Sequence, residues 1–115
     1  MKVSVFGAGY VGLVTAACFA EVGNNVVCLD VNEARVDQLK KGRVPIREDG
    51  LDTLVADNLH SGRLDFTTDT KQAVEHGEII FIAVGTPSDE DGSADLSYVL
   101  TAAEEIGANM SAPKV

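Results

Sequence analysis

The chain has 115 residues, of which 45% are hydrophobic, and it carries a formal net charge of −9. This length favours a single domain whose core needs no disulfide or metal to hold it together. The negative charge argues against nucleic acid and anionic membranes as partners. No apolar run reaches the roughly 18 residues that a membrane-spanning helix needs, and no signal peptide is evident. We therefore expect a cytoplasmic protein that binds neither nucleic acid nor membrane.

Strand-like and helix-like patterns alternate along the chain. Short Val- and Ile-rich runs predict strands, and apolar residues at three- and four-residue spacing predict helices. In chain order, we expect a strand at 2–6, a helix at 10–22, a strand at 25–29, a helix at 33–41, a loop at 42–50, a helix at 51–60, a strand at 64–67, a helix at 69–76, a strand at 78–84, a loop at 85–94 and a helix at 96–109. Lys114 and Val115 have the character of a further strand that begins there. The alternation predicts an α/β fold with a doubly wound, mainly parallel sheet and helices on both faces.

Several local signals add detail to this prediction. Asn32, Asp69 (or the preceding Thr68) and Asp95 are suited to cap the helices that follow them. The inward face predicted for the helix at 10–22 consists of Val11, Val14, Thr15, Cys18, Phe19 and Val22. Cys18 and Cys28 lack the spacing of metal ligands or redox pairs, so both are predicted to be small buried core residues.

The strongest motif is the glycine-rich segment G-A-G-Y-V-G at residues 7–12, which follows a predicted strand and opens a predicted helix. In that context Gly7 permits the tight turn, Gly9 lets the backbone approach a diphosphate, and Gly12 lets the helix pack close to the strand. The helix amides and dipole then face the anion. The motif predicts a Rossmann-type dinucleotide site, and the alternative is a glycine-rich turn without a ligand.

Asp30 ends the second predicted strand, 18 residues after Gly12. A dinucleotide site places there the acid that accepts hydrogen bonds from the adenosine ribose, and the same charge repels the 2′-phosphate of NADP. Arg35 argues the other way, because an arginine can accept that phosphate. Asp30 stands at the strand end and Arg35 within the next helix, so the sequence favours NAD as the cofactor.

With these residues placed, the chain resembles the UDP-glucose/GDP-mannose dehydrogenase family, and within it most closely the members that act on UDP-glucose. The resemblance runs over essentially the whole chain. The segments that carry it are G-A-G-Y-V-G-L (7–13), L-D-V-N-E-A-R-V (29–36), V-P-I-R-E-D-G-L (44–51), G-R-L-D-F-T-T-D (62–69), F-I-A-V-G-T-P (81–87) and D-E-D-G-S-A-D-L-S-Y-V (89–99). One departure is Asp49, which stands where the family usually has proline, so the stiffness of that loop is in question.

The resemblance implies roles for further residues. Tyr10 and Val11 would contact the cofactor through the phosphate loop, while Asp30 and Arg35 would hold the adenosine ribose. Thr86 would contact the cofactor beyond the fourth strand, which agrees with its place at a carboxyl strand end, where doubly wound sheets bind ligands.

The family's activity, as the resemblance implies it, is oxidation of the C6 alcohol of UDP-glucose to UDP-glucuronate with two NAD⁺. The family's catalytic cysteine and its lysine, asparagine and aspartate helpers would follow residue 115, and neither Cys18 nor Cys28 matches that motif. Residues 1–115 would thus form an incomplete NAD-binding domain, without the central helix and substrate domain. We expect the fragment alone to be inactive and the full-length enzyme to form a homo-oligomer.

Other functions are compatible with parts of this sequence. GDP-mannose or another UDP-sugar could be the substrate, since the sugar-binding residues lie mostly downstream. A non-catalytic NAD-sensing Rossmann module would share the glycine loop and the strand-end acid, but it would not show both the 42–62 insert and the 85–87 turn. A hydroxyacid-type dehydrogenase would share only the first 30 residues. The acidic segment 89–95 fails the EF-hand template, so no metal is expected.

Overall fold

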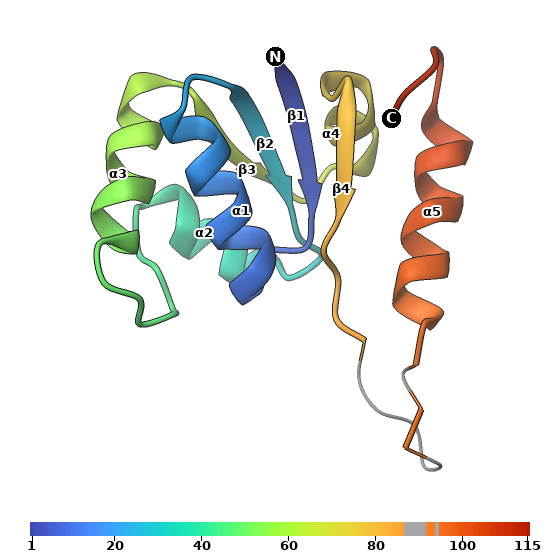
Figure 1. The fold of residues 1–115 in the computed structure, drawn as a ribbon, viewed down its shortest axis with the longest axis horizontal. Helices are drawn as coiled ribbons and strands as arrows, with labels where there is room; N and C mark the ends of the chain where they lie inside the picture. The colour runs from blue at the N-terminus through green and yellow to red at the C-terminus, as the bar shows by residue number, and fades with distance from the viewer. Residues whose placement is uncertain (87–91, 94) are drawn as a thin grey trace.

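The computed structural model describes residues 1–86, 92–93 and 95–115. These residues form a four-stranded parallel sheet with helices on both of its faces (Figure 1). The strands are β1 (Lys2–Phe6), β2 (Asn25–Leu29), β3 (Leu64–Thr67) and β4 (Ile79–Ile82). The helices are α1 (Tyr10–Glu21), α2 (Glu33–Lys40), α3 (Leu51–Ser61), α4 (Thr70–His76) and α5 (Ser97–Asn109). The predicted doubly wound α/β fold is confirmed.

The strand order is β3-β2-β1-β4, and every neighbouring pair is parallel. The chain adds β2 and β3 on one side of β1 and then returns to place β4 on the other side. The carboxyl ends of β1, β2 and β4 therefore share one edge of the sheet, with the change of direction between β1 and β4. In open α/β sheets this switch point is where ligands bind.

Two hydrophobic cores fill the space between the sheet and its helices. The larger core lies under α1, α2 and α3 and includes the sheet residues Val5, Cys28 and Phe66. The smaller core lies under α4 and α5 and includes Phe6 and Leu29. Figure 1 shows α1 and α3 on one face of the sheet and α4 and α5 on the other.

The inward face predicted for α1 is wrong. The buried positions are the small residues and one leucine, namely Gly12, Leu13, Ala16, Ala17 and Ala20. Val11 is 64% exposed, Val22 is 77% exposed and Cys18 is exposed, whereas Cys28 is buried as predicted. Val14 and Phe19, from the predicted set, are only partly buried and pack at the margin of the larger core, because the small side chains let the helix lie close on the sheet.

Most of the predicted boundaries agree with the structure to within two residues. Asn32 and Asp69 cap α2 and α4, each accepting a hydrogen bond from the backbone N–H three residues later. Asp95 instead accepts from the Ser97 N–H and lies one residue before the N-cap of α5. Among the described residues, no helix is long and apolar enough to cross a membrane.

The fourth strand is shorter than the predicted 78–84. Its last bond to β1 runs from the Ala83 N–H to the Phe6 carbonyl, because β1 turns away at Gly7 and offers no further partner. On the other edge of β4, the Val115 N–H donates to Glu78 O and the Val115 carbonyl accepts from Ile80 N. This is the pairing of a parallel neighbour, as predicted for Lys114 and Val115.

Candidate functional site

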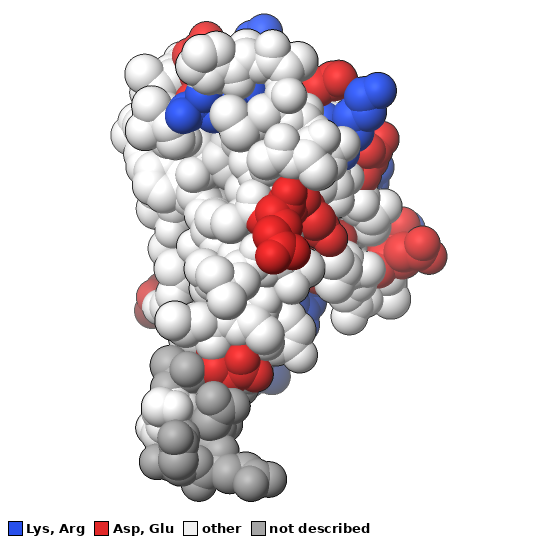
Figure 2. Space-filling model, turned by 90° about the vertical axis from the view of Figure 1, so that its right-hand side faces the viewer, with Lys and Arg blue, Asp and Glu red and all other residues white. Residues whose placement is uncertain are grey.

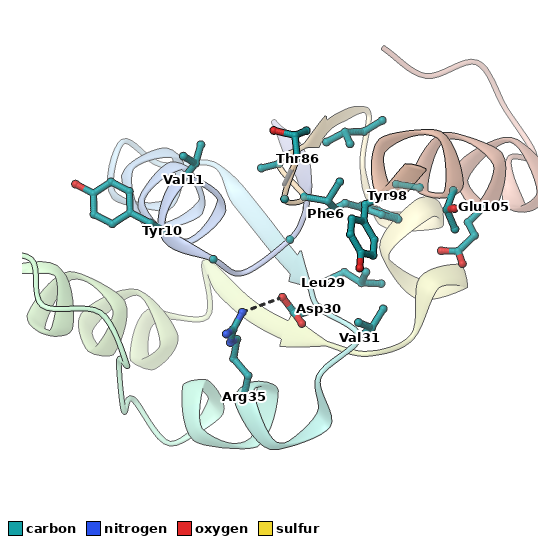
Figure 3. A pocket seen from close by; sticks show the side chains of 18 residues that line it. Phe6, Tyr10, Val11, Leu29, Asp30, Val31, Arg35, Thr86, Tyr98 and Glu105 are labelled. Carbon is teal, nitrogen blue, oxygen red and sulfur yellow. Dashed lines mark ion pairs between the residues drawn. The ribbon is translucent and has the colours of Figure 1, made fainter. Parts of the chain in front are cut away.

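A cavity of about 780 Å³ lies at the carboxyl edge of the sheet. Its walls come from the ends of β1, β2 and β4, the start of α1, and one face of α5 (Figure 3). The cavity thus occupies the switch point that the strand order creates.

The glycine turn shapes one wall of this cavity. Gly7 has a φ of +109°, and a Cβ there would lie 2.6 Å from Ala83 O. A Cβ at Gly12 would collide with the Gly7 carbonyl, so the contact between helix and turn excludes any side chain. Gly9 differs, since a Cβ there would meet nothing within 4 Å. The fold requires Gly7 and Gly12, whereas Gly9 leaves open space beside the backbone, where a ligand can approach.

The amides of the turn divide into two groups. The Gly7 N–H donates to Leu29 O at 2.7 Å, and the Ala8 N–H donates to Asp30 Oδ2 at 2.9 Å. The first bond within α1 is donated by Leu13 to Gly9 O, so the four preceding amides lack intrahelical acceptors. No acidic residue lies in the first turn of α1. The dipole and the amides at the start of α1, including those of Tyr10 and Val11, suit an anionic group.

Asp30 lies at the end of β2 and has a side chain only 12% exposed. Besides the Ala8 N–H, its carboxylate accepts from the Asn32 N–H at 2.9 Å. The Arg35 guanidinium lies 3.7 Å from Asp30 Oδ2. A carboxylate has about four acceptor positions, so acceptor capacity remains for a ligand. Asp30 thus braces the glycine turn as well as facing the cavity, a role that sequence reasoning did not predict.

The structure brings the predicted site residues together at one edge. Seven of them line the cavity: Gly7, Gly9, Tyr10, Val11, Asp30, Arg35 and Thr86. Gly12 does not line it but supports the turn from behind. Five basic residues lie between positions 35 and 47, and of these only Arg35 lines this cavity. The residues of the Asp89–Glu90–Asp91 segment lie outside the described part of the chain.

Two features of the site were not predicted. One face of α5, formed by Tyr98, Thr101, Ala102 and Glu105, lines the cavity opposite the end of β2. The spacing of three, four and seven residues indicates that these residues share one helix face. Only the strand order shows that this face points toward the site. The second feature is a hydrogen bond of 2.8 Å from the Tyr10 hydroxyl to Glu48 Oε2.

Burial and charge affect two groups near the turn. Burial and then the charge of Asp30 raise the pKa of Cys28 to about 12, and its thiol lies 3.8 Å from Gly7 O. The hydrogen bond to Glu48 and the charge of that carboxylate raise the pKa of the Tyr10 hydroxyl. Both groups are therefore neutral at physiological pH.

Known proteins are similar to this chain in sequence and in fold. The sequence pattern of the UDP-glucose/GDP-mannose dehydrogenase family, NAD binding domain, matches residues 1–115. UDP-glucose 6-dehydrogenase of Rhizobium meliloti is 59% identical over 96% of this chain and 25% of its own length. GDP-mannose 6-dehydrogenase of Pseudomonas aeruginosa is 44% identical over 93% of this chain and 24% of its own length.

Solved structures give the same picture. A GDP-mannose dehydrogenase from Pseudomonas aeruginosa, in a ternary complex, superposes with a TM-score of 0.92 at 43% identity and covers 95% of this chain and 25% of that one. A UDP-glucose dehydrogenase from the archaeon Pyrobaculum islandicum superposes with a TM-score of 0.90 at 47% identity and covers 95% and 26%. The chain therefore spans about a quarter of the length of the proteins it matches.

Proposed function

The chain belongs to the UDP-glucose/GDP-mannose dehydrogenase family and matches its NAD-binding domain. From this premise we propose that it is the NAD-binding part of an enzyme that oxidises the C6 alcohol of UDP-glucose to UDP-glucuronate with two NAD⁺. The observation that carries this proposal is the meeting of the glycine turn, the free amides of α1 and Asp30 around one cavity. GDP-mannose is the alternative substrate, because relatives that act on it also align with nearly the whole chain.

The residues of the cavity fit an adenine dinucleotide. The open space beside Gly9 admits a diphosphate to the amides of Tyr10 and Val11. Asp30 keeps acceptor positions for ribose hydroxyls, and Arg35 lies beside it. Thr86 lines the cavity at the end of β4 and would contact the cofactor there. When bound, NAD⁺ supplies the acceptor for the hydride that leaves the sugar alcohol.

We assign no catalytic residue to this chain. Cys28 is buried with a raised pKa, so it cannot serve as the thiolate nucleophile of the family's reaction. Nucleotide-sugar recognition, the central helix and homo-oligomer assembly belong, in this proposal, to parts of the enzyme beyond these 115 residues. The chain alone is expected to bind NAD⁺ without forming uronate, in the cytoplasmic setting expected from the sequence.

The experiment is a calorimetric titration of the chain with NAD⁺ and NADP⁺. At about 5 Å and an effective dielectric of about 20, the Asp30 carboxylate repels a unit charge on a 2′-phosphate by about 3 kcal/mol. NAD⁺ should therefore bind roughly a hundredfold more tightly than NADP⁺. Asp30→Asn removes the charge while keeping an acceptor for Ala8, and it should shrink this preference.

Asp37→Asn is the matched control, since it removes the same charge from an exposed position of α2 outside the cavity lining. It should leave the preference unchanged. Tighter binding of NADP⁺ than of NAD⁺ by the unaltered chain would contradict the cofactor assignment. Uronate formation by the chain alone would contradict the absence of a catalytic residue.

A further inference from the structure

One face of α5 forms a wall of the cavity although no role has been given to it. Tyr98, Thr101, Ala102 and Glu105 follow one another at helical spacing and all line the cavity. Tyr98 is 58% exposed, and Ala102 is buried against the smaller core, which anchors this face. The wall therefore presents an accessible aromatic ring and a carboxylate from a fixed helix.

The position of this wall relates it to one end of a dinucleotide. In Figure 3 Tyr98, Leu29 and Val31 appear on one side of Asp30, and Tyr10 and Val11 appear on the other; all of them line the cavity. A diphosphate at the α1 amides and a ribose at Asp30 fix two points of the ligand. The base attached to that ribose continues away from the diphosphate, which leads toward Tyr98.

The side chains at this end suit a purine. Leu29, Val31 and the Tyr98 ring supply apolar and aromatic surface within the cavity lining, and Val31 is among the most exposed apolar residues of the described chain. Flat bases pack favourably on aromatic rings. The Glu105 carboxylate can only accept hydrogen bonds. Because it would repel an anionic ligand, it favours a part of the ligand that carries a hydrogen-bond donor. The exocyclic amine of adenine is such a donor.

We propose that this face of α5 is the adenine-binding wall of the site, with Tyr98 packing on the base and Glu105 accepting from its 6-amino group. The proposal rests on the proposed function, because it requires an adenine dinucleotide in the cavity. It makes α5 a determinant of base specificity, in addition to the glycine turn and Asp30.

The first test separates the two halves of the cofactor. The chain and its Tyr98→Ala variant are titrated with NAD⁺, AMP and nicotinamide mononucleotide. Loss of the ring should weaken NAD⁺ and AMP roughly tenfold, which is the usual effect of removing one base-stacking aromatic side chain. Affinity for nicotinamide mononucleotide should not change. Tyr98→Phe keeps the ring and should bind as the unaltered chain does.

The second test concerns the amino group. Nicotinamide hypoxanthine dinucleotide carries a carbonyl oxygen where adenine carries the amine, so Glu105 should disfavour it. Glu105→Gln introduces an amide donor and should reduce the preference for NAD⁺ over this analogue by roughly tenfold, the scale of one charged hydrogen bond. Glu104→Gln, on the same helix but outside the cavity lining, is the control and should keep the full preference.

The outcomes distinguish this inference from the function beneath it. If the unaltered chain binds neither NAD⁺ nor AMP, both fail. Leu100→Ala serves as a control, because Leu100 is exposed on α5 and lies outside the cavity lining. If the unaltered chain binds NAD⁺ but Tyr98→Ala and Leu100→Ala bind it equally well, the proposal of an adenine-binding wall is wrong and the NAD site stands. Equal losses of AMP and nicotinamide mononucleotide affinity in Tyr98→Ala would also overturn it. Because both altered residues are exposed, unchanged melting temperatures should accompany the binding changes.

Discussion

Gly9 and Gly12 belong to one motif but have different physical reasons for lacking a side chain. At Gly12 the reason is internal, because the Gly7 carbonyl occupies the position that a Cβ would take. At Gly9 nothing in the described chain lies within 4 Å of a Cβ, and φ is an ordinary −75°. In the proposed function, the missing side chain at Gly9 leaves room for the ligand.

This difference predicts opposite effects of the same substitution. Gly12→Ala should lower the free energy of unfolding by about 3 kcal/mol, since the turn and helix must separate. Gly9→Ala should cost less than about 1 kcal/mol, a change of N-cap residue only, yet abolish measurable NAD⁺ binding. Chemical denaturation and calorimetric titration of both variants test this. Equal losses of stability would show that Gly9 is also a packing residue.

The sequence predicts which residues meet at the site better than it predicts what each one does. The spacing of Gly7, Gly12 and Asp30 is set by a strand–helix–strand unit, so it can be read directly. The bond from Ala8 to Asp30 depends on how two strand ends lie side by side, which no local pattern encodes. The same holds for Tyr98 and Glu105, because their approach to the cavity follows from the position of β4.

At the scale of elements, the loop between α2 and α3 is held to the start of α1. Its apolar residues Val44 and Ile46 pack partly buried against the larger core, and the Tyr10 hydroxyl donates to Glu48. The loop carries Asp49 in place of the family's usual proline, so its fixation depends on these contacts.

Tyr10→Phe removes the hydrogen bond and should release this loop. We expect faster tryptic cleavage after Arg43 or Arg47, with an unchanged melting temperature because the hydroxyl is exposed. Glu48→Gln keeps an acceptor for the hydroxyl and should be cleaved at the original rate. Identical cleavage rates for Tyr10→Phe and the unaltered chain would mean that the apolar contacts alone hold the loop.

The prediction of elements succeeded where strand-like and helix-like patterns alternate clearly. It failed where the packing depends on the size of the side chains. Short apolar runs separated by capped helices determine the order of strands and helices. The inward face of α1 was mistaken because alanine and glycine, which allow close packing, score as weakly hydrophobic. The end of β4 was placed too late because Ala83 and Val84 are apolar but lack a strand partner beyond Phe6.

At the scale of the whole molecule, one buried thiol contributes to the loss of stability at alkaline pH. Cys28 lies in the middle of the sheet, and its pKa is raised from 9.0 to about 12 by burial and the Asp30 charge. The unfolded chain loses this proton near pH 9, whereas the folded chain keeps it. The contribution of the neutral Cys28 thiol to the free energy of unfolding is therefore fully present below about pH 9, and it is lost as the pH rises toward 12.

This thiol alone should lower the unfolding free energy by about 1.4 kcal/mol per pH unit through this range, the value for one proton. Cys28→Ala should remove this contribution to the slope, although its smaller side chain lowers stability at neutral pH. Cys18→Ala changes an exposed thiol and should retain the slope. Urea denaturation at several pH values measures all three chains. An unchanged slope in Cys28→Ala would show that other groups dominate the alkaline loss.

The double engagement of Asp30 also bears on how the cofactor preference can change during evolution. A substitution of Asp30 by a residue without a side-chain oxygen would admit a phosphate next to Arg35, but it would remove the acceptor for the Ala8 N–H at the same time. Such a change toward NADP would therefore weaken the glycine turn that binds the diphosphate, unless a second mutation supplies a new acceptor for the Ala8 N–H. Selection for a stable fold would then favour side chains at position 30 that keep an oxygen for Ala8, and aspartate does so while also repelling the 2′-phosphate.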